Sequence, residues 1–429
     1  MKRIHSFVQG ECAAFTSSVR SFLPSHVVVP FIQNGNENFV FTANTGDFVK
    51  EGQVIVSDRN EYSTYESEIH APLPGKIESI VNCTLPNGKV SPAAKIKFSG
   101  KFDYLGRKNS ERDWNVFSST YLLEELKNKG VTNTFDGCVS LAGQIKKCAL
   151  KENRFLIVRL FDSEPGLTID SFIAENFRRE VAVGADIIAK AMNAEGIIFA
   201  VSKKEPAAME TVLPSYNVPV KSFEFDNTKY PCGFVPDIIK EVKKSSKNES
   251  SRFAHISRNC IFIDAQTSYS AYEAAGKGIP VLEKFIEISG TSLSSSAMFK
   301  VRLGTSIKDL VMQCGGFKSR LSKVIVNGLV NGFQINTLDM PVTKEVKAIT
   351  FLSFSELHNQ QINSCIRCGK CRSICPENLY PDLIYRAATD SEIIQTTVLC
   401  SQCNLCNSIC PSRLPLSQKI SILRKQYEV

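Results

Sequence analysis

Short apolar runs separated by a helix-like segment organise the middle of the chain. The runs at residues 155–158, 196–201 and 260–263 are uninterrupted and of strand length, and residues 218–223 form a further mostly apolar run, so the four segments predict strands. Between the first two, residues 171–194 repeat Ala and Ile at helical spacing, which predicts one helix. This alternation of strand and helix predicts a mainly parallel sheet covered on both faces.

The front of the chain follows a different pattern, in which glycines punctuate short alternating runs. Residues 46–55 and 69–80 combine turn glycines with apolar positions that would face a small core. These stretches resemble the two halves of the biotinyl/lipoyl barrel-sandwich hybrid. Such domains attach their cofactor to a lysine between the halves, and residues 54–69 contain none, so attachment is excluded. We expect His70 to be a packed or capping residue.

A second strand-rich region lies between the middle and the tail. Residues 285–290, 306–311 and 323–328 are strand-like runs bounded by turns. The region 284–345 resembles the soluble-ligand-binding β-grasp (SLBB) domain. We expect it to act as a spacer that packs the middle of the chain onto the tail.

Composition and charge exclude several classes of protein. The chain has 429 residues, 43% of them hydrophobic and 22% charged, which indicates a folded protein of about two to four domains. We find no apolar run of transmembrane or signal-peptide length, so we expect neither a membrane span nor secretion. The net charge of +8 comes without a nucleic-acid-binding signature, so no nucleic acid is expected as a partner.

The cysteines carry the chemical information. Eight of the 15 crowd into the segment from Cys365 to Cys410, where the pattern C-x2-C-x2-C-x3-C-P occurs twice. A disulfide framework would be spread over a small secreted domain, so this clustering indicates metal ligation in a reducing compartment. The spacing is that of bacterial two-cluster ferredoxins.

In two-cluster ferredoxins, the first three cysteines of a motif bind one cubane and the fourth binds the other. The resemblance assigns one [4Fe–4S] cluster to Cys365, Cys368, Cys371 and Cys410. It assigns the second [4Fe–4S] cluster to Cys400, Cys403, Cys406 and Cys375. Irons capped only by cysteine leave no position for substrate, so the pair would conduct electrons. Zinc, the alternative, usually takes its ligands in two separated pairs.

The surroundings of the two motifs add two expectations. Residues 376–399, between them, repeat apolar positions at helical spacing with Pro381 near the start, which predicts an α-helical insertion. Arg367, Lys370 and Arg372 lie within the first motif, and their charge should offset that of a nearby cluster.

From about residue 25 onward, order and motifs resemble the RnfC subunit of the Rnf ion-translocating electron-transport complex. The middle of that subunit is similar to the flavin- and NADH-binding subunit of respiratory complex I. Residues 161–166 (FDSEPG) look like the family's acidic E-x-E-P segment, and residues 229–233 (KYPCG) like its K-Y-P-x-G segment. The resemblance implies FMN and NADH as cofactors, with Glu164 as a candidate cofactor-binding residue.

One departure bears directly on those cofactors. The family has a G-x-G-G-A-G-F-P-T loop that brings backbone amides close to flavin and nicotinamide phosphates. Residues 133–143 stand in its place and retain only Gly137 and Gly143, with Gly137 the second candidate for cofactor binding. Phe135 and Asp136 add bulk and negative charge where a phosphate would lie, which disfavours FMN and NADH.

We therefore predict an α+β multidomain protein. Its predicted parts are an N-terminal segment (1–30), a lipoyl-like barrel-sandwich hybrid (31–100), a Rossmann-like α/β domain similar to the complex I flavoprotein (101–283), an SLBB-like β-grasp domain (284–345) and an α-helical two-cluster ferredoxin domain (346–429).

The resemblance implies a peripheral electron-transfer subunit at the cytoplasmic face of the cell membrane. Its partners would be the other Rnf-type membrane subunits, which translocate Na+ or H+, and it would reach the membrane only through them. One alternative is a relay and docking subunit for flavodoxin or ferredoxin that lacks NADH and FMN chemistry. A second alternative is a two-cluster subunit of a soluble dehydrogenase, against which the lipoyl-like and β-grasp regions argue.

Overall fold

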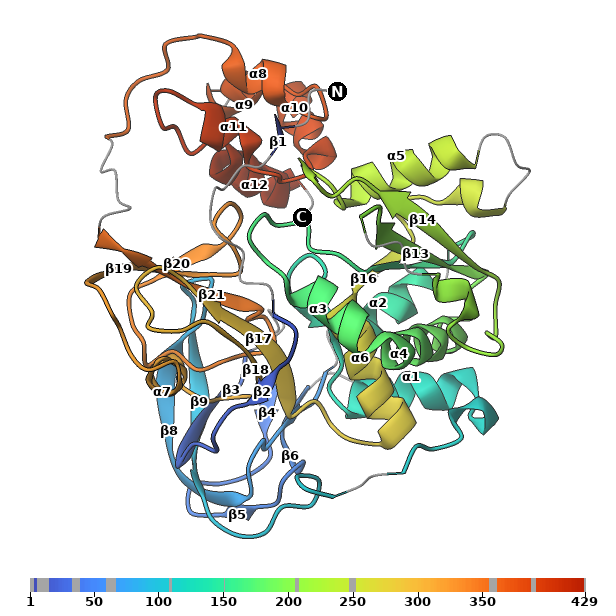
Figure 1. Cartoon of the computed structure of the whole chain (residues 1–429), viewed down its shortest axis with the longest axis vertical. Coiled ribbons are helices and arrows are strands. Elements are labelled where there is room, and N and C mark those ends of the chain that lie inside the picture. Colours follow the sequence, from blue (N-terminus) through green and yellow to red (C-terminus); the bar gives the residue numbers. More distant parts are fainter. Residues whose placement is uncertain are drawn as a thin grey trace.

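The computed structural model gives the chain several packed units (Figure 1). It describes residues 4–5, 15–32, 39–58, 67–107, 110–149, 151–204, 208–246, 252–354, 361–386 and 391–427. Two β-rich units lie side by side at the lower left of Figure 1, an α/β unit lies at the right, and the C-terminal helices form a lobe at the top. Among the described residues, no helix has both the length and the apolar character required to span a bilayer.

The front unit consists of two small sheets that enclose an apolar core. Its strands are β3 (His26–Pro30), β4 (Phe39–Phe41), β5 (Phe48–Val49), β6 (Val54–Asp58), β7 (Ile69–His70), β8 (Gly75–Thr84) and β9 (Val90–Phe98). They pair in the orders β3-β9-β8-β5 and β4-β6-β7. Ile55, Ile77 and Ile96 are fully buried between the sheets. The unit thus begins at His26, within the segment that we assigned to the N-terminus.

The α/β unit is built on a four-stranded parallel sheet, as the alternating pattern predicted. Its strands are β12 (Phe155–Arg159), β13 (Gly196–Ser202), β14 (Val220–Phe225) and β16 (Ile261–Asp264), in the order β14-β13-β12-β16. Its helices are α1 (Ser119–Asn128), α2 (Leu141–Cys148), α3 (Ile169–Asn176), α4 (Arg178–Ala191), α5 (Val235–Ser245) and α6 (Ala265–Ala271). Leu156 and Val158 face one core and Phe155 and Ile157 the other, so both faces of the sheet are covered.

Short elements complete this unit and its connections. They are β1 (Ile4–His5), η1 (Trp114–Val116), β10 (Thr132–Asn133), β11 (Val139–Ser140), η2 (Met209–Thr211), β15 (Lys229–Tyr230), η3 (Arg252–His255) and the π-helical turn η4 (Tyr272–Gly276). β1 pairs with β15, and β10 pairs with β11.

The single helix expected over residues 171–194 is wrong, because the structure has two helices there, α3 and α4. They meet at Phe177, whose backbone leaves the helical region (φ −128°, ψ 39°). The Phe177 ring packs against Tyr269 and Phe285, with ring centroids 5.1 and 5.0 Å away. Tertiary packing of this aromatic ring accompanies a break that local periodicity did not indicate.

The second β-rich unit has a six-stranded mixed sheet. Its strands are β2 (Val19–Arg20), β17 (Glu283–Ser289), β18 (Ala297–Arg302), β19 (Leu321–Val326), β20 (Phe333–Ile335) and β21 (Ala348–Ser353), in the order β2-β18-β17-β21-β19-β20. β2 and β21 lie outside residues 284–345, so the sheet draws on chain that we assigned to the N-terminal segment and to the tail.

The strand expected at residues 306–311 is wrong, because this segment begins helix α7 (Ile307–Gln313). Ser306 caps the helix by accepting a hydrogen bond from the Asp309 amide. Ile307, Leu310 and Val311 then pack into the core under the sheet, a spacing that fits a helix. The run was too short for its period to decide between strand and helix.

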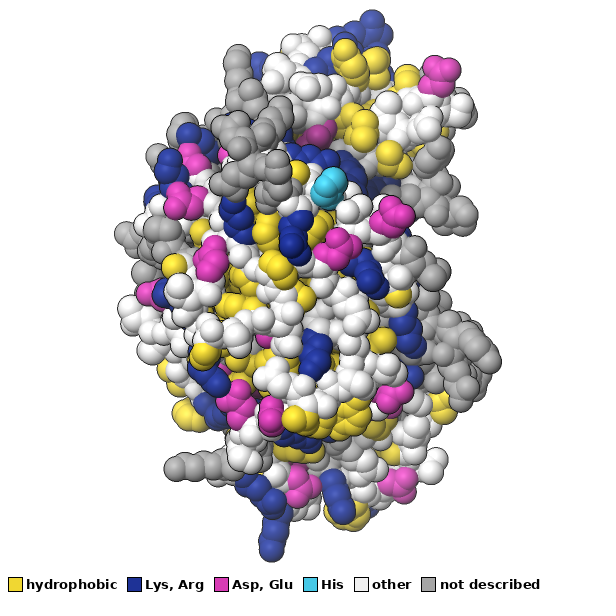
Figure 2. Space-filling view, turned by 90° about the vertical axis from the view of Figure 1, so that its right-hand side faces the viewer, with side chains coloured by type: hydrophobic (Ala, Val, Ile, Leu, Met, Phe, Trp, Pro, Cys, Tyr) yellow, Lys and Arg dark blue, Asp and Glu magenta, His cyan; other side chains and the backbone are white. Residues whose placement is uncertain are grey.

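The tail is helical, and the expected insertion between the cysteine motifs is confirmed. Its elements are α8 (Lys370–Ile374), α9 (Pro381–Arg386), α10 (Ser391–Gln395), η6 (Thr396–Leu399), α11 (Leu405–Ile409) and α12 (Leu416–Tyr427). Pro381 is the first residue of α9, where its missing N–H leaves no intrahelical bond unmade. In Figure 2, Lys and Arg are interspersed with Asp and Glu over the visible face of the molecule.

Candidate functional site

The two cysteine motifs repeat one backbone conformation. Arg367 and Gln402 precede the second cysteine of their motifs and have φ of 54° and 57°. Gly369 and Asn404 follow it and have φ of 71° and 56°. Positive φ is uncommon outside glycine, so its recurrence at matching positions marks two loops of the same shape. Each loop then enters a short helix, α8 or α11, that begins just before the third cysteine.

The first predicted ligand set lines one small cavity in the tail. The cavity is bordered by Cys365, Cys368, Cys371 and Cys410, together with Leu414 and Leu416. Cys410 belongs to the second motif, so the two motifs meet at this cavity. Cys371 is buried and Cys368 is exposed, so the cavity reaches the surface at one side.

The second predicted ligand set is more deeply placed. Cys403 and Cys406 are buried, whereas Cys375 and Cys400 are partly exposed and flank a separate apolar cluster. Burial, with a smaller contribution from the neighbouring Cys400 and Cys375, raises the pKa of the Cys403 thiol to about 11. Four thiolates this close would repel one another unless a cationic group bound them, which is what iron in a cluster supplies.

Both sets therefore have the donor chemistry of a cubane site, and the first set also lines a single cavity. Among the residues described by the structure, no group of three or more His, Cys, Asp or Glu side chains is close enough to hold a single metal ion. The assignment of four cysteines to each cluster thus stays a prediction.

The basic residues of the first motif have separate surroundings. Arg367 lines the cavity beside its cysteines. Arg372 instead makes two 2.6 Å hydrogen bonds to the Asp382 carboxylate, which also accepts one from Arg386. Asp382 Oδ1 lies 3.9 Å from the Cys371 sulfur. Because Asp382 neutralises Arg372, Arg367 is better placed than Arg372 to offset charge at the cysteines.

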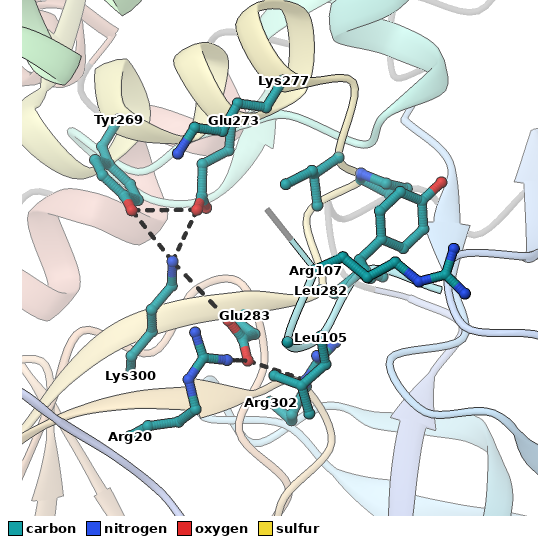
Figure 3. A pocket seen from close by; sticks show the side chains of 14 residues that line it. Arg20, Leu105, Arg107, Tyr269, Glu273, Lys277, Leu282, Glu283, Lys300 and Arg302 are labelled. Carbon is teal, nitrogen blue, oxygen red and sulfur yellow. Dashed lines mark hydrogen bonds and ion pairs between the residues drawn. The ribbon is translucent and has the colours of Figure 1, made fainter. Parts of the chain in front are cut away.

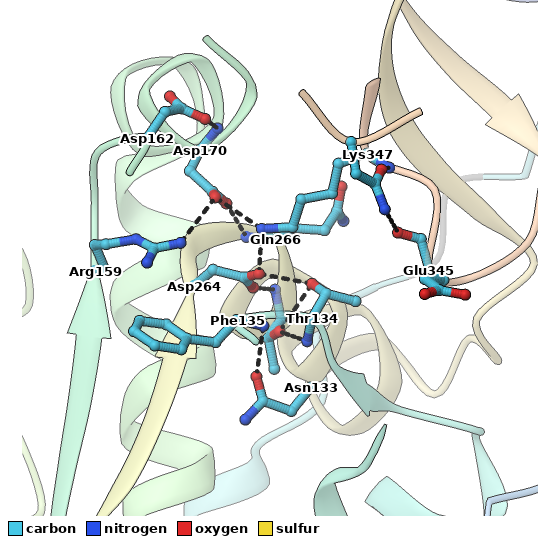
Figure 4. A network of polar contacts seen from close by, with 12 residues as sticks. Asn133, Thr134, Phe135, Arg159, Asp162, Asp170, Asp264, Gln266, Glu345 and Lys347 are labelled. Atoms are coloured by element: carbon cyan, nitrogen blue, oxygen red, sulfur yellow. Dashed lines mark hydrogen bonds and ion pairs between the residues drawn. The ribbon is translucent and has the colours of Figure 1, made fainter. Parts of the chain in front are cut away.

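A second polar site lies at the carboxyl edge of the parallel sheet, where the degraded loop meets strands β12 and β16 (Figure 4). The Thr134 hydroxyl donates to Asp264 (2.7 Å), and the Thr134 amide donates to the Thr267 hydroxyl (3.0 Å). The Phe135 ring lies 4.2 Å from the guanidinium carbon of Arg159, which is buried. These contacts fix the loop on the sheet through side chains that a glycine-rich loop would lack.

Lys347, which comes from the start of strand β21, closes this edge. Its ammonium lies 2.9 Å from Asp170 and 2.5 Å from Asp264, and Arg159 lies 3.9 Å from Asp170. Burial alone would lower the pKa of Lys347, but the two carboxylates outweigh it and raise that pKa. Burial raises the pKa of Asp170 to about 6, whereas Lys347 and the Thr134 and Thr267 hydrogen bonds hold the pKa of Asp264 below its usual range.

This edge does not fit the phosphates of a flavin or dinucleotide. Arg159 and Lys347, which lie at this edge, are already bound to the carboxylates of Asp170 and Asp264. A phosphate would have to displace a carboxylate from a fully desolvated ion network, at high cost. Gly137 has φ +101° and open space around its Cα, so it forms a turn without any close approach to neighbouring atoms.

Glu164, the other candidate, is covered by a turn of the adjacent β-rich unit. Its carboxylate accepts hydrogen bonds from the backbone amides of Val330 and Asn331 and from the Asn331 side chain (2.7 Å). Gly328 permits this approach, since a Cβ there would lie 2.2 Å from Glu164 Cγ. Burial raises the pKa of Glu164 to about 7. The residue therefore joins two units and does not face an open cofactor site.

The same turn connects Glu164 to the second cysteine loop. Asn331 also donates to the Tyr230 hydroxyl (3.2 Å), and Tyr230 donates to the carbonyl of Cys403 (2.6 Å). The Asn404 side chain donates to the Val330 carbonyl (2.8 Å). Three units of the protein thus meet within one chain of hydrogen bonds that ends at a predicted cluster ligand.

Sequence reasoning missed the residues that join the units. Tyr230 lies within the recognised K-Y-P-x-G segment, so the motif marked its position without indicating its contact. Lys347, Asp382 and Asn331 had no such signal, because their partners lie elsewhere in the chain and meet them only in the folded protein.

Fold and site together define a mixed α/β multidomain protein with a flavoprotein-like α/β unit and a cysteine-rich tail. The family of the Nuo51 FMN-binding domain matches residues 140–273. The crystal structure of an NAD+-reducing [NiFe]-hydrogenase in the air-oxidized state aligns with a TM-score of 0.45 at 11% identity, over 72% of this chain and 54% of that chain.

Curated relatives make the resemblance more specific. The C subunit of the proton-translocating ferredoxin:NAD(+) oxidoreductase complex of Clostridium ljungdahlii is 26% identical over 84% of this chain and 78% of its own length. The C subunit of the ion-translocating oxidoreductase complex of Rhodobacter capsulatus is 24% identical over 88% of this chain and 72% of its own length. Over most of its length, the chain therefore resembles the C subunit of ion-translocating oxidoreductase complexes, as its motifs indicated.

Proposed function

We propose that this protein is a peripheral electron-transfer subunit of an Rnf-type membrane complex. In this proposal, electrons pass through two [4Fe–4S] clusters in the tail, between a soluble carrier and membrane subunits that translocate Na+ or H+. The observation that carries it is the pair of cysteine loops that share one backbone shape. Their two motifs together supply eight thiols, which are four ligands for each predicted cluster. The similarity to the C subunits of ion-translocating complexes supports the other subunits of such a complex as partners, and we place this subunit on the cytoplasmic face of the membrane.

The chain's own residues perform the remaining tasks of an electron relay. Bound clusters would supply one-electron transfer without an open site for substrate. The thiols hold the clusters, and apolar residues such as Leu414 and Leu416 limit water at the first set. Tyr230 and Asn404 hold the second cysteine loop against the other units, which fixes its distance to them.

This function could be carried out with FMN and NADH chemistry or as a relay without it. The side chains at the sheet edge favour the relay. The match to an FMN-binding family raises the expectation of flavin. Lys347, Asp170 and Asp264 occupy the edge with a buried ion network, and Phe135 covers Arg159 beside it. The proposed donor or acceptor is consequently a small electron-transfer protein such as flavodoxin or ferredoxin.

Anaerobic reconstitution followed by reduction tests both levels of the proposal. We expect about eight irons per chain, a cubane signal by paramagnetic resonance, and reduction of the clusters by reduced flavodoxin. Tightly bound zinc without a cubane signal would overturn the electron-transfer proposal. If one equivalent of FMN bound and NADH then bleached flavin and clusters in turn, the relay form would be wrong while electron transfer would stand.

A further inference from the structure

A ligand-sized cavity (Figure 3) is lined by residues that belong neither to the cysteine motifs nor to the ion network of the sheet edge. It has a volume of about 530 Å³ and is enclosed by the loop 104–107, the end of the α6–η4 helix and strands β17 and β18. Small-molecule sites typically have volumes of about 300–1,000 Å³ and favour junctions between domains. This cavity has that size and lies between the α/β unit and the second β-rich unit, with Gly52 and Glu51 of the front unit directly behind Tyr104 and Arg302.

The inner wall of the cavity holds a built set of charges. Lys300 lies 2.8 Å from Glu273 and 3.2 Å from the Tyr269 hydroxyl. Arg302 is nearly fully buried, and its guanidinium lies 2.7 Å from Glu51 and 3.0 Å from Glu283. These side chains are therefore held in place by packing and ion pairs before any ligand arrives, which lowers the entropic cost of binding.

One carboxylate is shared by several cations on this wall. Glu283 contacts Arg20, Arg302 (3.0 Å) and Lys300 (3.9 Å). Arg20 has no other carboxylate within ion-pair distance among the described residues, and its side chain is 51% exposed. Arg20 can therefore turn part of its guanidinium toward an incoming anion.

Two further cations increase the positive charge of the lining. Lys277 has an aromatic neighbour, the Tyr272 ring at 5.0 Å, and no carboxylate within ion-pair distance in the described part of the chain. Arg107 is 62% exposed and 3.8 Å from Asp103. Five cations and two carboxylates line the cavity, and adding Glu51 and Asp103 still leaves five against four. The lining thus favours an anion.

The remaining wall is apolar and firmly packed. Tyr104, Leu105, Ile279, Pro280 and Leu282 form it. The Tyr104 ring needs Gly52 beneath it, because a Cβ at that position would lie 2.6 Å from the ring. A flat or apolar body could rest on this wall while an anionic end met the cations opposite.

We propose that this cavity binds a small anionic metabolite that carries a phosphate or carboxylate group on an apolar or aromatic body. The site is separate from the flavin-like edge of the sheet, since its lining residues on this helix, Tyr269 and Glu273, lie five and nine residues beyond Asp264, about 8 and 13 Å along the helix. The helix ends there in the π-helical turn η4, a feature often found at functional sites. Binding would tie three units together.

Calorimetric titration of the full chain with three probes tests this inference. Adenosine diphosphate carries both an anion and an aromatic body, pyrophosphate only the anion, and adenosine only the body. We expect affinity to fall in the order adenosine diphosphate, pyrophosphate, adenosine. Arg20→Gln and Lys277→Gln should each weaken binding of adenosine diphosphate by about fivefold, the scale of an exposed ion pair.

A matched control separates the cavity from general surface charge. Lys308→Gln removes an exposed lysine on α7, outside the cavity lining, and should leave all three affinities unchanged. The proposal fails if none of the anionic probes binds. It also fails if binding of adenosine diphosphate is unaffected by Arg20→Gln and Lys277→Gln, or is weakened equally by Lys308→Gln. The iron content of every variant should match the parent, so this outcome is independent of the proposed relay function.

Discussion

The cysteine loops of the tail and the carboxyl edge of the parallel sheet are both places where the chain resembles a cofactor-binding protein. In the tail, each loop keeps the full ligand spacing and one backbone shape. At the sheet edge, the fold matches an FMN-binding domain, yet Lys347, Arg159, Asp170 and Asp264 neutralise one another there. Under the proposed function, the fold is kept while paired side chains fill its cofactor edge, whereas the cysteine loops keep the spacing that cluster ligands require.

The largest effect should come from single cysteine substitutions, which would break the tail's side of the comparison. Cys371→Ser should remove the first cluster and Cys375→Ser the second, each with loss of about four of about eight irons and of electron transfer. Iron analysis and paramagnetic resonance would distinguish the two losses. Cys314→Ser, at a buried cysteine outside the motifs, is the control and should retain both clusters. Loss of the first cluster in place of the second in Cys375→Ser would refute the exchange of ligands between the motifs, and retention of both clusters would refute Cys375 as a ligand.

Lys347→Met should destabilise the protein by about 3–5 kcal/mol, since it leaves Asp170 and Asp264 buried without their cation. Urea unfolding of the parent, this variant and Lys308→Met measures the change, with the exposed Lys308 as the control. A loss of unfolding free energy below about 1 kcal/mol is far under the cost of breaking a buried ion pair. Such a result would mean that water or another group reaches this edge. The contrast between a filled sheet edge and the cysteine loops of the tail would then weaken.

Glu164→Gln should change how stability depends on pH. The folded-state pKa of Glu164, about 7, lies above the ordinary value of 4.5, so the folded state holds its proton more tightly than the unfolded state. Its contribution to stability is therefore complete below pH 4.5 and is lost as the pH rises through about 7. Between about pH 5 and 8, the parent should lose on the order of 2 kcal/mol relative to the variant.

Unfolding curves at several pH values would show this difference. The glutamine can keep the turn at residues 328–331, because the Asn331 side-chain oxygen has no hydrogen-bond partner among the described residues and can accept from it. Parallel pH profiles for parent and variant would show that Glu164 is solvated, in conflict with its place under the turn.

The smallest effect should be electrochemical and would sharpen the description of the first cluster. Asp382→Asn removes a negative charge 3.9 Å from the Cys371 sulfur and frees the charge of Arg372. The potential of the first cluster should rise by an amount on the order of tens of millivolts, because local charge sets cluster potentials. Redox titration followed by paramagnetic resonance measures it, and a fall in potential would contradict the assigned neighbourhood.

Sequence by itself determined the features that rest on local patterns. Uninterrupted apolar runs predicted three of the four parallel strands, since buried strands must be apolar on both faces. The spacing of the cysteines predicted two loops of one kind. The first three cysteines of each motif lie within seven consecutive residues, so a short stretch of chain is enough to bring them together. The loss of glycines around Phe135 and Asp136 already indicated a poor phosphate site.

Tertiary structure alone decided what depends on distant partners. The break at Phe177, the helix at Ile307–Gln313 and the extension of the second sheet to Ser353 follow from packing between remote segments. Lys347 reached Asp170 from 177 residues away. The cavity beside Arg302 likewise exists only because three units meet there. Burial and ion pairing are set by the folded chain, and no local period encodes them.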